Sequence, residues 1–182
     1  MKKIVVFLGS PRKNGYSARL AEQVIAGAKS KGADVMVCDL NEDGIKGCQG
    51  CNYCKTHTEC VQTDKMSPAL EALRTADGVV ATFPIYWMDI SGQAKLFLDR
   101  LYSFTAKDFS AKHPGKKFVT IFSQGSGKED AYKHVADTHN GYFKMFGWQQ
   151  VDSILGWGSN FGVELTQEQL DRAYEAGCKL AE

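Results

Sequence analysis

The sequence predicts a single α/β domain built as a three-layer sandwich, with a parallel β-sheet covered by helices on both faces. Short apolar runs alternate with amphipathic helical patterns along all 182 residues. Most apolar runs lack the alternation of a half-exposed strand, so both faces of these strands are expected to be buried. No repeat, low-complexity tract or linker interrupts residues 1–182. The length and the uniform pattern therefore favour one domain.

The first half of the chain supplies three strands and two helices. Strands are expected at residues 3–8, 33–40 and 78–83, each an apolar run bounded by polar residues or glycine. Helices are expected at residues 17–31 and 65–75. Gly32 is a typical residue to end the first helix. The apolar residues on the inward face of that helix recur at helical spacing: Leu20, Ala21, Val24, Ile25 and Ala28.

The second half continues the alternation. Helices are expected at residues 90–102 and 129–146, and strands at residues 117–123 and 149–155. The last helix is expected to start at Thr166, because Thr166-x-x-Gln169 is a capping-box pattern. Strands that each lead into a helix form right-handed parallel crossovers. Ligands bind such sheets beyond the carboxyl ends of the strands, so the loops after the first, third and fourth strands become the candidate site.

Composition limits the class of function. The formal net charge is only +1, so nothing in the charge balance indicates nucleic-acid binding. No segment is long and apolar enough for a signal peptide or a membrane helix, and a cytoplasmic protein is expected. In that compartment the six cysteines need an explanation other than disulfides. Cys38 and Cys178 are expected to be small buried side chains, and His113, His134 and His139 are expected on the surface.

The loop from Gly9 to Ser17 has the character of an anion site. It ends at a helix N-terminus, where free N–H groups and the helix dipole favour negative charge. Ser10, Asn14 and Ser17 can donate to phosphate oxygens, and Arg12 adds a charge. The loop lacks both the Gly-x-Gly-x-x-Gly pattern of dinucleotide-binding folds and the NTPase phosphate-loop pattern. A polar turn capped by Ser17 is the alternative interpretation.

Two further loops are candidates for the rest of a ligand. The segment after the third strand places Tyr86, Trp87 and Met88 where polar residues are usual. A flat aromatic cofactor would explain these side chains, and so would a subunit interface. The Ser123–Gly127 segment offers glycines that permit a close backbone approach and amide groups that suit the polar edge of a ring.

A cysteine-rich loop spans residues 47–63. Cys48-x2-Cys51-x2-Cys54 places three thiols on overlapping turns, and Cys60 follows closely. Close-spaced thiolates on one loop suit an iron–sulfur cluster, whereas structural zinc usually takes two separated pairs. Free thiols are the other interpretation.

Three motifs together resemble the NADPH-dependent FMN reductase family of the flavodoxin-like superfamily. They are Gly9-Ser10-Pro11-Arg12-x-Asn14-Gly15-x-Ser17, then Pro84-Ile85-Tyr86-Trp87, then Ser91-Gly92-Gln93-x-Lys95-x-Phe97-x-Asp99-Arg100. The cysteine motif is similar to that of the branch containing iron–sulfur flavoproteins. Tyr16 departs from the family pattern, in which a smaller polar residue is more usual.

This resemblance implies a flavodoxin-like sandwich with a five-stranded parallel sheet in the order 2-1-3-4-5. The cofactor would be FMN. The resemblance places its phosphate on Ser10, Arg12, Asn14, Gly15 and Ser17. It places the isoalloxazine on Pro84, Ile85, Tyr86 and Trp87, with Ser123, Gln124 and Gly125 along the edge. It also implies a 4Fe–4S cluster on Cys48, Cys51, Cys54 and Cys60.

The function expected from the resemblance is an FMN-dependent oxidoreductase. NAD(P)H would reduce FMN, and a flavin, a quinone or another small acceptor would take the electrons. The 4Fe–4S cluster would offer one route for them. No catalytic side chain is expected, because hydride transfer belongs to the cofactor. The alternative is an electron carrier that exchanges electrons with a ferredoxin-like protein and does not oxidise NAD(P)H. A regulatory module that senses through its cysteines is a third, non-redox possibility. The resemblance implies a homodimer or homotetramer.

Overall fold

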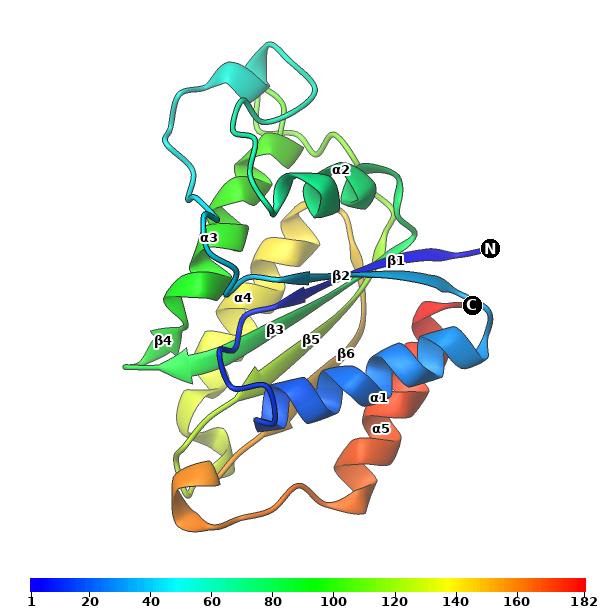
Figure 1. Ribbon diagram of the computed structural model, residues 1–182, viewed down its shortest axis with the longest axis vertical. Coiled ribbons are helices and arrows are strands. Elements are labelled where there is room, and N and C mark those ends of the chain that lie inside the picture. Colours follow the sequence, from blue (N-terminus) through cyan, green and yellow to red (C-terminus); the bar gives the residue numbers. More distant parts are fainter.

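The protein, described by a computed structural model over residues 1–182, has the three-layer α/β architecture that the sequence predicts (Figure 1). Five strands pair in parallel in the order β2-β1-β3-β5-β6. Their bounds are β1 (Lys3–Leu8), β2 (Asp34–Asp39), β3 (Gly78–Tyr86), β5 (Lys117–Ser123) and β6 (Gln149–Gly156). The predicted order is confirmed. A sixth, two-residue strand, β4 (Asp89–Ile90), was not expected and pairs antiparallel with the end of β3.

Helices cover both faces of this sheet. Their bounds are α1 (Tyr16–Ser30), α2 (Ser67–Thr75), α3 (Gly92–Arg100), α4 (Lys133–Met145) and α5 (Gln167–Leu180). Four short 3-10 turns join them: η1 (Tyr53–Lys55), η2 (Leu101–Phe104), η3 (Glu129–Tyr132) and η4 (Ser159–Phe161). α1 and α5 lie together on one face, and the other three helices lie on the opposite face (Figure 1). No helix combines the length and apolar character needed to cross a membrane.

The sheet has a core on each side because its strands are apolar in both directions. Along β1, Val5 and Phe7 face the core under α2, α3 and α4, whereas Ile4 and Val6 face the core under α1 and α5. The first core is rich in phenylalanine, and the second is built mostly from aliphatic residues. This arrangement explains why the strands lack an alternating pattern.

The structure corrects three local expectations. β3 continues to Tyr86 and does not end at residue 83, so the aromatic segment begins as strand and not as loop. The helix expected over residues 129–146 is divided, with η3 preceding α4. His139 is 5% exposed and its Nδ1 lies 2.8 Å from the Val135 carbonyl oxygen, so it is not a surface residue. The capping box of Thr166 and Gln169 is confirmed.

The crossing of α1 and α5 depends on two glycines. A Cβ at Gly27 would lie 2.0 Å from the Tyr174 carbonyl oxygen, and one at Gly177 would lie 2.0 Å from the Val24 carbonyl oxygen. The backbones of α1 and α5 are therefore in direct contact at Gly27 and Gly177, where no side chain separates them. Cys178 is buried at this crossing as expected, with its thiol 3.5 Å from the Gly27 carbonyl oxygen.

We expect Gly177→Ala to lower the free energy of unfolding by about 1–3 kcal/mol, because α5 must move off α1. Gly141→Ala is the matched control. Gly141 lies within α4, and a Cβ there meets nothing within 4 Å. The control should raise stability by about 0.5–1 kcal/mol through helix propensity alone. Urea titrations of both variants measure this, and equal effects would contradict the close crossing.

Candidate cofactor-binding site

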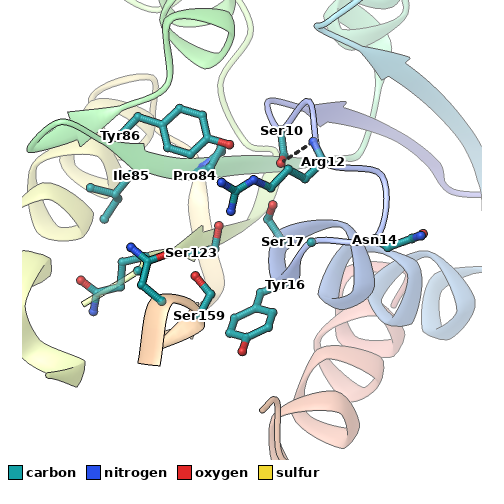
Figure 2. A pocket seen from close by; sticks show the side chains of 14 residues that line it. Ser10, Arg12, Asn14, Tyr16, Ser17, Pro84, Ile85, Tyr86, Ser123 and Ser159 are labelled. Atoms are coloured by element: carbon teal, nitrogen blue, oxygen red, sulfur yellow. Dashed lines mark hydrogen bonds between the residues drawn. The ribbon is translucent and has the colours of Figure 1, made fainter. Parts of the chain in front are cut away.

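One open cavity lies at the carboxyl ends of the strands, between the β1–α1 loop and the ends of β3 and β5 (Figure 2). Its lining includes every residue that the sequence predicted for the cofactor except Trp87. It also includes three residues that the prediction missed, Tyr16, Ser159 and Asn160. Four segments far apart in the sequence are therefore brought to one place, as expected of a parallel sheet.

The β1–α1 loop presents free donors to this cavity. Gly15 is the N-cap of α1, and no side chain caps the helix. The alternative interpretation, a turn capped by Ser17, is therefore wrong. The Ser17 hydroxyl is 1% exposed and has no hydrogen-bond partner within the protein. A buried hydroxyl and uncapped helix N–H groups cost free energy unless a ligand satisfies them, and a phosphate does so well.

Two other loop side chains differ in how they face the cavity. The Arg12 guanidinium points toward the space between Ser17 and Tyr86, whereas Asn14 points away from it (Figure 2). The Ser10 hydroxyl oxygen accepts a hydrogen bond from the Arg12 N–H at 3.2 Å. Arg12 can therefore neutralise an anion held at the end of α1. The role expected for Asn14 stays a prediction.

The end of β3 forms an apolar wall of the cavity. Pro84, Ile85 and Tyr86 line it. Trp87 lies at the tip of the β3–β4 hairpin, where it is 97% exposed and adopts a left-handed φ of 46°. Trp87 is thus outside the cavity lining in this structure, and its predicted contact with a ring stays a prediction. Met88 is also left-handed, with a φ of 76°, so the hairpin turn holds two strained residues.

The opposite rim contains an unpartnered acceptor. The Gln124 side chain is buried, and its Nε2 donates to the carbonyl oxygens of Lys128 and Glu129 at 3.2 and 2.6 Å. These two bonds fix the amide orientation and leave Oε1 without a partner. A ring that carries an N–H along its edge would satisfy this oxygen. The donor set of the cavity therefore fits a phosphate at one end and a polar ring edge at the other.

The three missed residues come from two connections. Ser159 and Asn160 lie on η4, just beyond β6, and a Cβ at Gly125 would lie 2.3 Å from Asn160 Nδ2. The rule that ligands bind beyond strand ends applies equally to the last strand and could have identified them. Tyr16 donates its hydroxyl hydrogen to the Val163 carbonyl oxygen, so it ties this connection to the start of α1.

Gly9 holds the two main walls of the cavity together. Its N–H donates to Thr82 Oγ1 on β3 at 2.8 Å, and its carbonyl oxygen accepts from the Ser91 hydroxyl at 2.8 Å. A Cβ at Gly9 would lie 2.5 Å from the Thr82 carbonyl oxygen and 2.9 Å from the Ala94 Cβ. Only glycine fits there. Ser91 is also the N-cap of α3, since its Oγ accepts from the Ala94 N–H.

The cysteine-rich loop lies away from this cavity, past the C-terminal end of α3 (Figure 1). All six cysteines are free. Cys48, Cys51, Cys54 and Cys60 line one small cavity with Arg100 and Gln62. No three acidic, histidine or cysteine side chains of the protein are grouped closely enough to hold a metal ion as they stand. The donor set nevertheless fits an iron–sulfur group, because four thiols and a buried cation share one cavity.

Two lysines fasten the cysteine loop to the segment after α3. Lys55 Nζ donates to the carbonyl oxygens of Tyr102 and Thr105 at 2.8 and 2.9 Å, and lies 3.4 Å from the centroid of the Tyr102 ring. Lys112 Nζ donates to the carbonyl oxygens of Cys54 and His57 at 2.5 and 3.2 Å. Burial lowers the pKa of Lys55. The loop is therefore anchored through the Lys55 side chain and through its own backbone carbonyl groups, and none of these contacts uses a thiol.

A buried ion pair fixes the ends of the cysteine-rich loop to α3. Arg100 Nη1 lies 2.7 Å from Asp64 Oδ2, and the two side chains are 0% and 2% exposed. Burial by itself raises the pKa of Asp64, but hydrogen bonds from the Lys46 N–H and from Arg100 outweigh it and leave the pKa below its ordinary value. Arg100 Nη1 also donates to the Lys46 carbonyl oxygen at 3.0 Å. The pair thus joins both ends of the cysteine-rich loop to α3.

Comparisons with known proteins agree with this site. The family model described as NADPH-dependent FMN reductase matches residues 2–161. An iron–sulfur flavoprotein of Archaeoglobus fulgidus is 29% identical over 180 residues, which cover 99% of this chain and 79% of the relative. An iron–sulfur flavoprotein of Methanosarcina thermophila is 25% identical over 163 residues, covering 88% of this chain and 80% of the relative.

Solved structures share the fold. An NAD(P)H:quinone oxidoreductase from Methanothermobacter marburgensis superposes with a TM-score of 0.76 at 20% identity, covering 99% of this chain and 96% of that one. An FMN-dependent NADH-azoreductase from Bacillus anthracis, in complex with FMN, gives a TM-score of 0.72 at 15% identity and covers all of both chains. At this level of identity the likeness establishes the architecture.

We expect Ser91→Ala to lower stability by about 2–3 kcal/mol, since it removes a helix cap and leaves the buried Gly9 carbonyl without its donor. It should also weaken FMN binding several-fold, because the Ser91 hydroxyl holds Gly9 and Gly9 positions the β1–α1 loop. Thr166→Ala is the control: it removes the cap of α5, costs about 1 kcal/mol and should leave FMN affinity unchanged. Denaturation and flavin-fluorescence titrations measure both, and equal FMN affinity in the two variants would contradict the coupling.

The Asp64 ion pair predicts acid sensitivity. Because the pKa of Asp64 is lowered by folding, its contribution is complete above the unfolded pKa of about 4 and disappears as pH falls through the folded value. Asp64→Asn should lose about 3–5 kcal/mol near neutral pH and show a flatter decline between about pH 5 and 3. Asp137→Asn, which opens an exposed ion pair on α4, should follow the wild-type curve. Urea titrations across this range provide the measurement.

Proposed function

The chain belongs to the NADPH-dependent FMN reductase family, and from this premise we propose that its cavity binds FMN and passes electrons from NAD(P)H to a small acceptor. Membership makes the protein an FMN-dependent NAD(P)H oxidoreductase.

The main support for FMN as the ligand is the Ser17 hydroxyl, which has no hydrogen-bond partner within the protein. It lies buried at the uncapped N-terminus of α1, with the Arg12 guanidinium pointing toward it (Figure 2). A phosphate monoester there accepts from Ser17, from the first helix N–H groups and from Arg12. The protein provides this charge-assisted binding without a metal ion. Ser10 and Gly15 complete the turn around the anion.

The ring of FMN is proposed to lie against Pro84, Ile85 and Tyr86, with its polar edge toward the Gln124 carbonyl. FMN supplies the hydride chemistry when it is bound. The side chains bind and orient it, and no lining residue is needed as a general acid or base. Trp87, Met88 and Phe161 are exposed apolar side chains on the β3–β4 hairpin and on η4. They provide an apolar surface beside the cavity for a flat acceptor such as a quinone or a free flavin.

Cys48, Cys51, Cys54 and Cys60 are proposed to hold a 4Fe–4S cluster. Their location on one cavity, the free state of all four thiols and the backbone anchoring of their loop support this assignment. Gly50 and Asn52 adopt left-handed φ angles of 65° and 59° between these cysteines, which lets the short loop turn sharply. Four unpaired thiols also favour a reducing compartment, in keeping with the expected cytoplasmic location.

The cysteine cavity also favours a second candidate function, an electron carrier that exchanges electrons with a ferredoxin-like protein. Steady-state NAD(P)H oxidation in the presence of a quinone or free flavin separates the two. Turnover supports the reductase, and its absence in protein that contains FMN supports the carrier.

A second copy of the chain is proposed to cover an apolar groove on the α3–α4 face. Leu98, Phe109, Tyr142, Met145 and Phe146 line this groove. Met145 is 79% exposed and Phe109 is 70% exposed, an exposure that favours association.

We expect Ser17→Ala to weaken FMN binding by about tenfold or more, the loss of one hydrogen bond to a charged group. Its affinity for riboflavin, which has no phosphate, should stay at the wild-type value. Ser30→Ala is the control at the other end of α1, where the hydroxyl donates to the Gly27 carbonyl oxygen. It should change neither affinity. Fluorescence titrations with FMN and with riboflavin measure these affinities. An equal loss of affinity for riboflavin would mean that Ser17 does not contact the phosphate.

A further inference from the structure

Arg100 has one donor nitrogen, Nε, that makes no hydrogen bond in the fold. Its Nη1 binds Asp64 and the Lys46 carbonyl oxygen, and its Nη2 lies 3.4 Å from the Gln62 carbonyl oxygen. Its Nε–H has no partner, although the residue is only 1% exposed. A buried N–H without an acceptor costs free energy that the ion pair does not require. A lysine could have paired with Asp64 without this cost.

The unused donor belongs to a residue that lines the cavity of the four cysteines. Other positive charge lies in and beside the same loop. Lys55 belongs to the loop and donates to the Tyr102 carbonyl oxygen, and Lys112 donates to the Cys54 carbonyl oxygen from outside it. The only carboxylate hydrogen-bonded to Arg100 is Asp64, which occupies Nη1 and not Nε. The cavity of the four cysteines is therefore lined by a buried cation whose Nε–H has no acceptor within the protein. This is the environment that suits an anionic sulfur group.

We propose that Arg100 is a positioning residue that donates its Nε–H to a sulfur of the cysteine-bound iron–sulfur group and thereby raises its reduction potential. The proposal rests on the cluster put forward under the proposed function. Adding one electron to such a group adds one negative charge, and a buried charge-assisted donor stabilises the reduced form more than the oxidised form. The electron comes from the reductant in the assay or from the flavin, and no bond is formed or broken.

Arg100→Lys tests this directly. Lysine keeps the positive charge for Asp64, but it has a methylene group where arginine has Nε–H. Arg74→Lys is the matched control: Arg74 also lies in the last turn of a helix, its side chain is 8% exposed, and it pairs with Glu71. Arg74 does not line the cysteine cavity. Both variants and the wild type are purified and reconstituted with iron and sulfide under anaerobic conditions, and iron per chain is counted.

The readout is a potentiometric titration followed by electron paramagnetic resonance of the reduced iron–sulfur group, with flavin absorbance recorded in parallel. Arg100→Lys should shift the iron–sulfur midpoint to a more negative value. The ratio of reduced to oxidised group at the wild-type midpoint should fall about tenfold, which corresponds to about 59 mV for one electron. The flavin midpoint and the Arg74→Lys protein should match the wild type. An unchanged iron–sulfur midpoint in Arg100→Lys overturns the proposal. That result is expected if a water molecule links the Arg100 Nε–H to the buried side-chain oxygen Gln62 Oε1, which also has no partner.

A second variant covers the case in which Arg100→Lys does not fold. Arg100→Gln combined with Asp64→Asn removes the buried charges together, so the net charge is unchanged and no ion is left unpaired. The same negative shift is expected from it, and a wild-type midpoint would again refute the role of Arg100. A wild-type protein that binds flavin but no iron rejects the cluster, and with it this inference. Failure of the cluster assignment is thus seen as a protein without iron. Failure of the Arg100 proposal is seen as an iron-loaded protein whose midpoint potential is unchanged by the substitutions.

Discussion

The site depends on the two hydrogen bonds made by the backbone of Gly9. One joins the end of β1 to Thr82 on β3, and the other joins it to Ser91 at the start of α3. A side chain at Gly9 would collide with both elements, so only glycine allows the β1–α1 loop to pass between β3 and α3 as it leaves the sheet. The loop that offers Ser17 and the strand end that offers Tyr86 are thereby held on opposite sides of one cavity. Neither wall could be positioned by its own segment alone.

α3 extends this constraint to the cysteine loop. Its N-cap Ser91 belongs to the cofactor cavity, and its last residue, Arg100, belongs to the cysteine cavity. The helix has nine residues, a length of about 14 Å at 1.5 Å per residue. One rigid element thus sets the separation between the proposed flavin and the proposed iron–sulfur group. A change at either end that moved α3 would alter both sites, whereas a change confined to the loop would leave the flavin cavity intact.

The sequence is sufficient for features that depend on local pattern. The parallel sheet with helices on both faces follows from strands that are apolar on both faces, whereas its strand order came from the resemblance to the FMN reductase family. The anion site on the β1–α1 loop follows from its position at a helix start. The β3–β4 hairpin could not be foreseen, because it needs left-handed backbone at Trp87 and Met88, which sequence patterns disfavour. The place of Asn160 depends on its contact with Gly125, and the burial of Arg100 depends on Asp64. Such long-range contacts leave no periodic signal.

The two sites also differ in how they are stabilised. The flavin cavity is built from strand ends and a helix start, and these elements are packed on the two apolar cores. The cysteine loop has almost no regular structure and is fastened through Lys55, Lys112 and the Arg100–Asp64 pair. Each of these contacts places a positive charge near the thiols, and each uses a backbone carbonyl or a carboxylate as its anchor. The contacts that hold the loop therefore also set the electrostatic environment of the thiols. A substitution of Lys55, Lys112 or Asp64 therefore changes the geometry of the loop and the electrostatic environment of the thiols together. The Nε–H of Arg100 makes no contact that holds the loop. Its removal can therefore test the electrostatic effect apart from the geometric one.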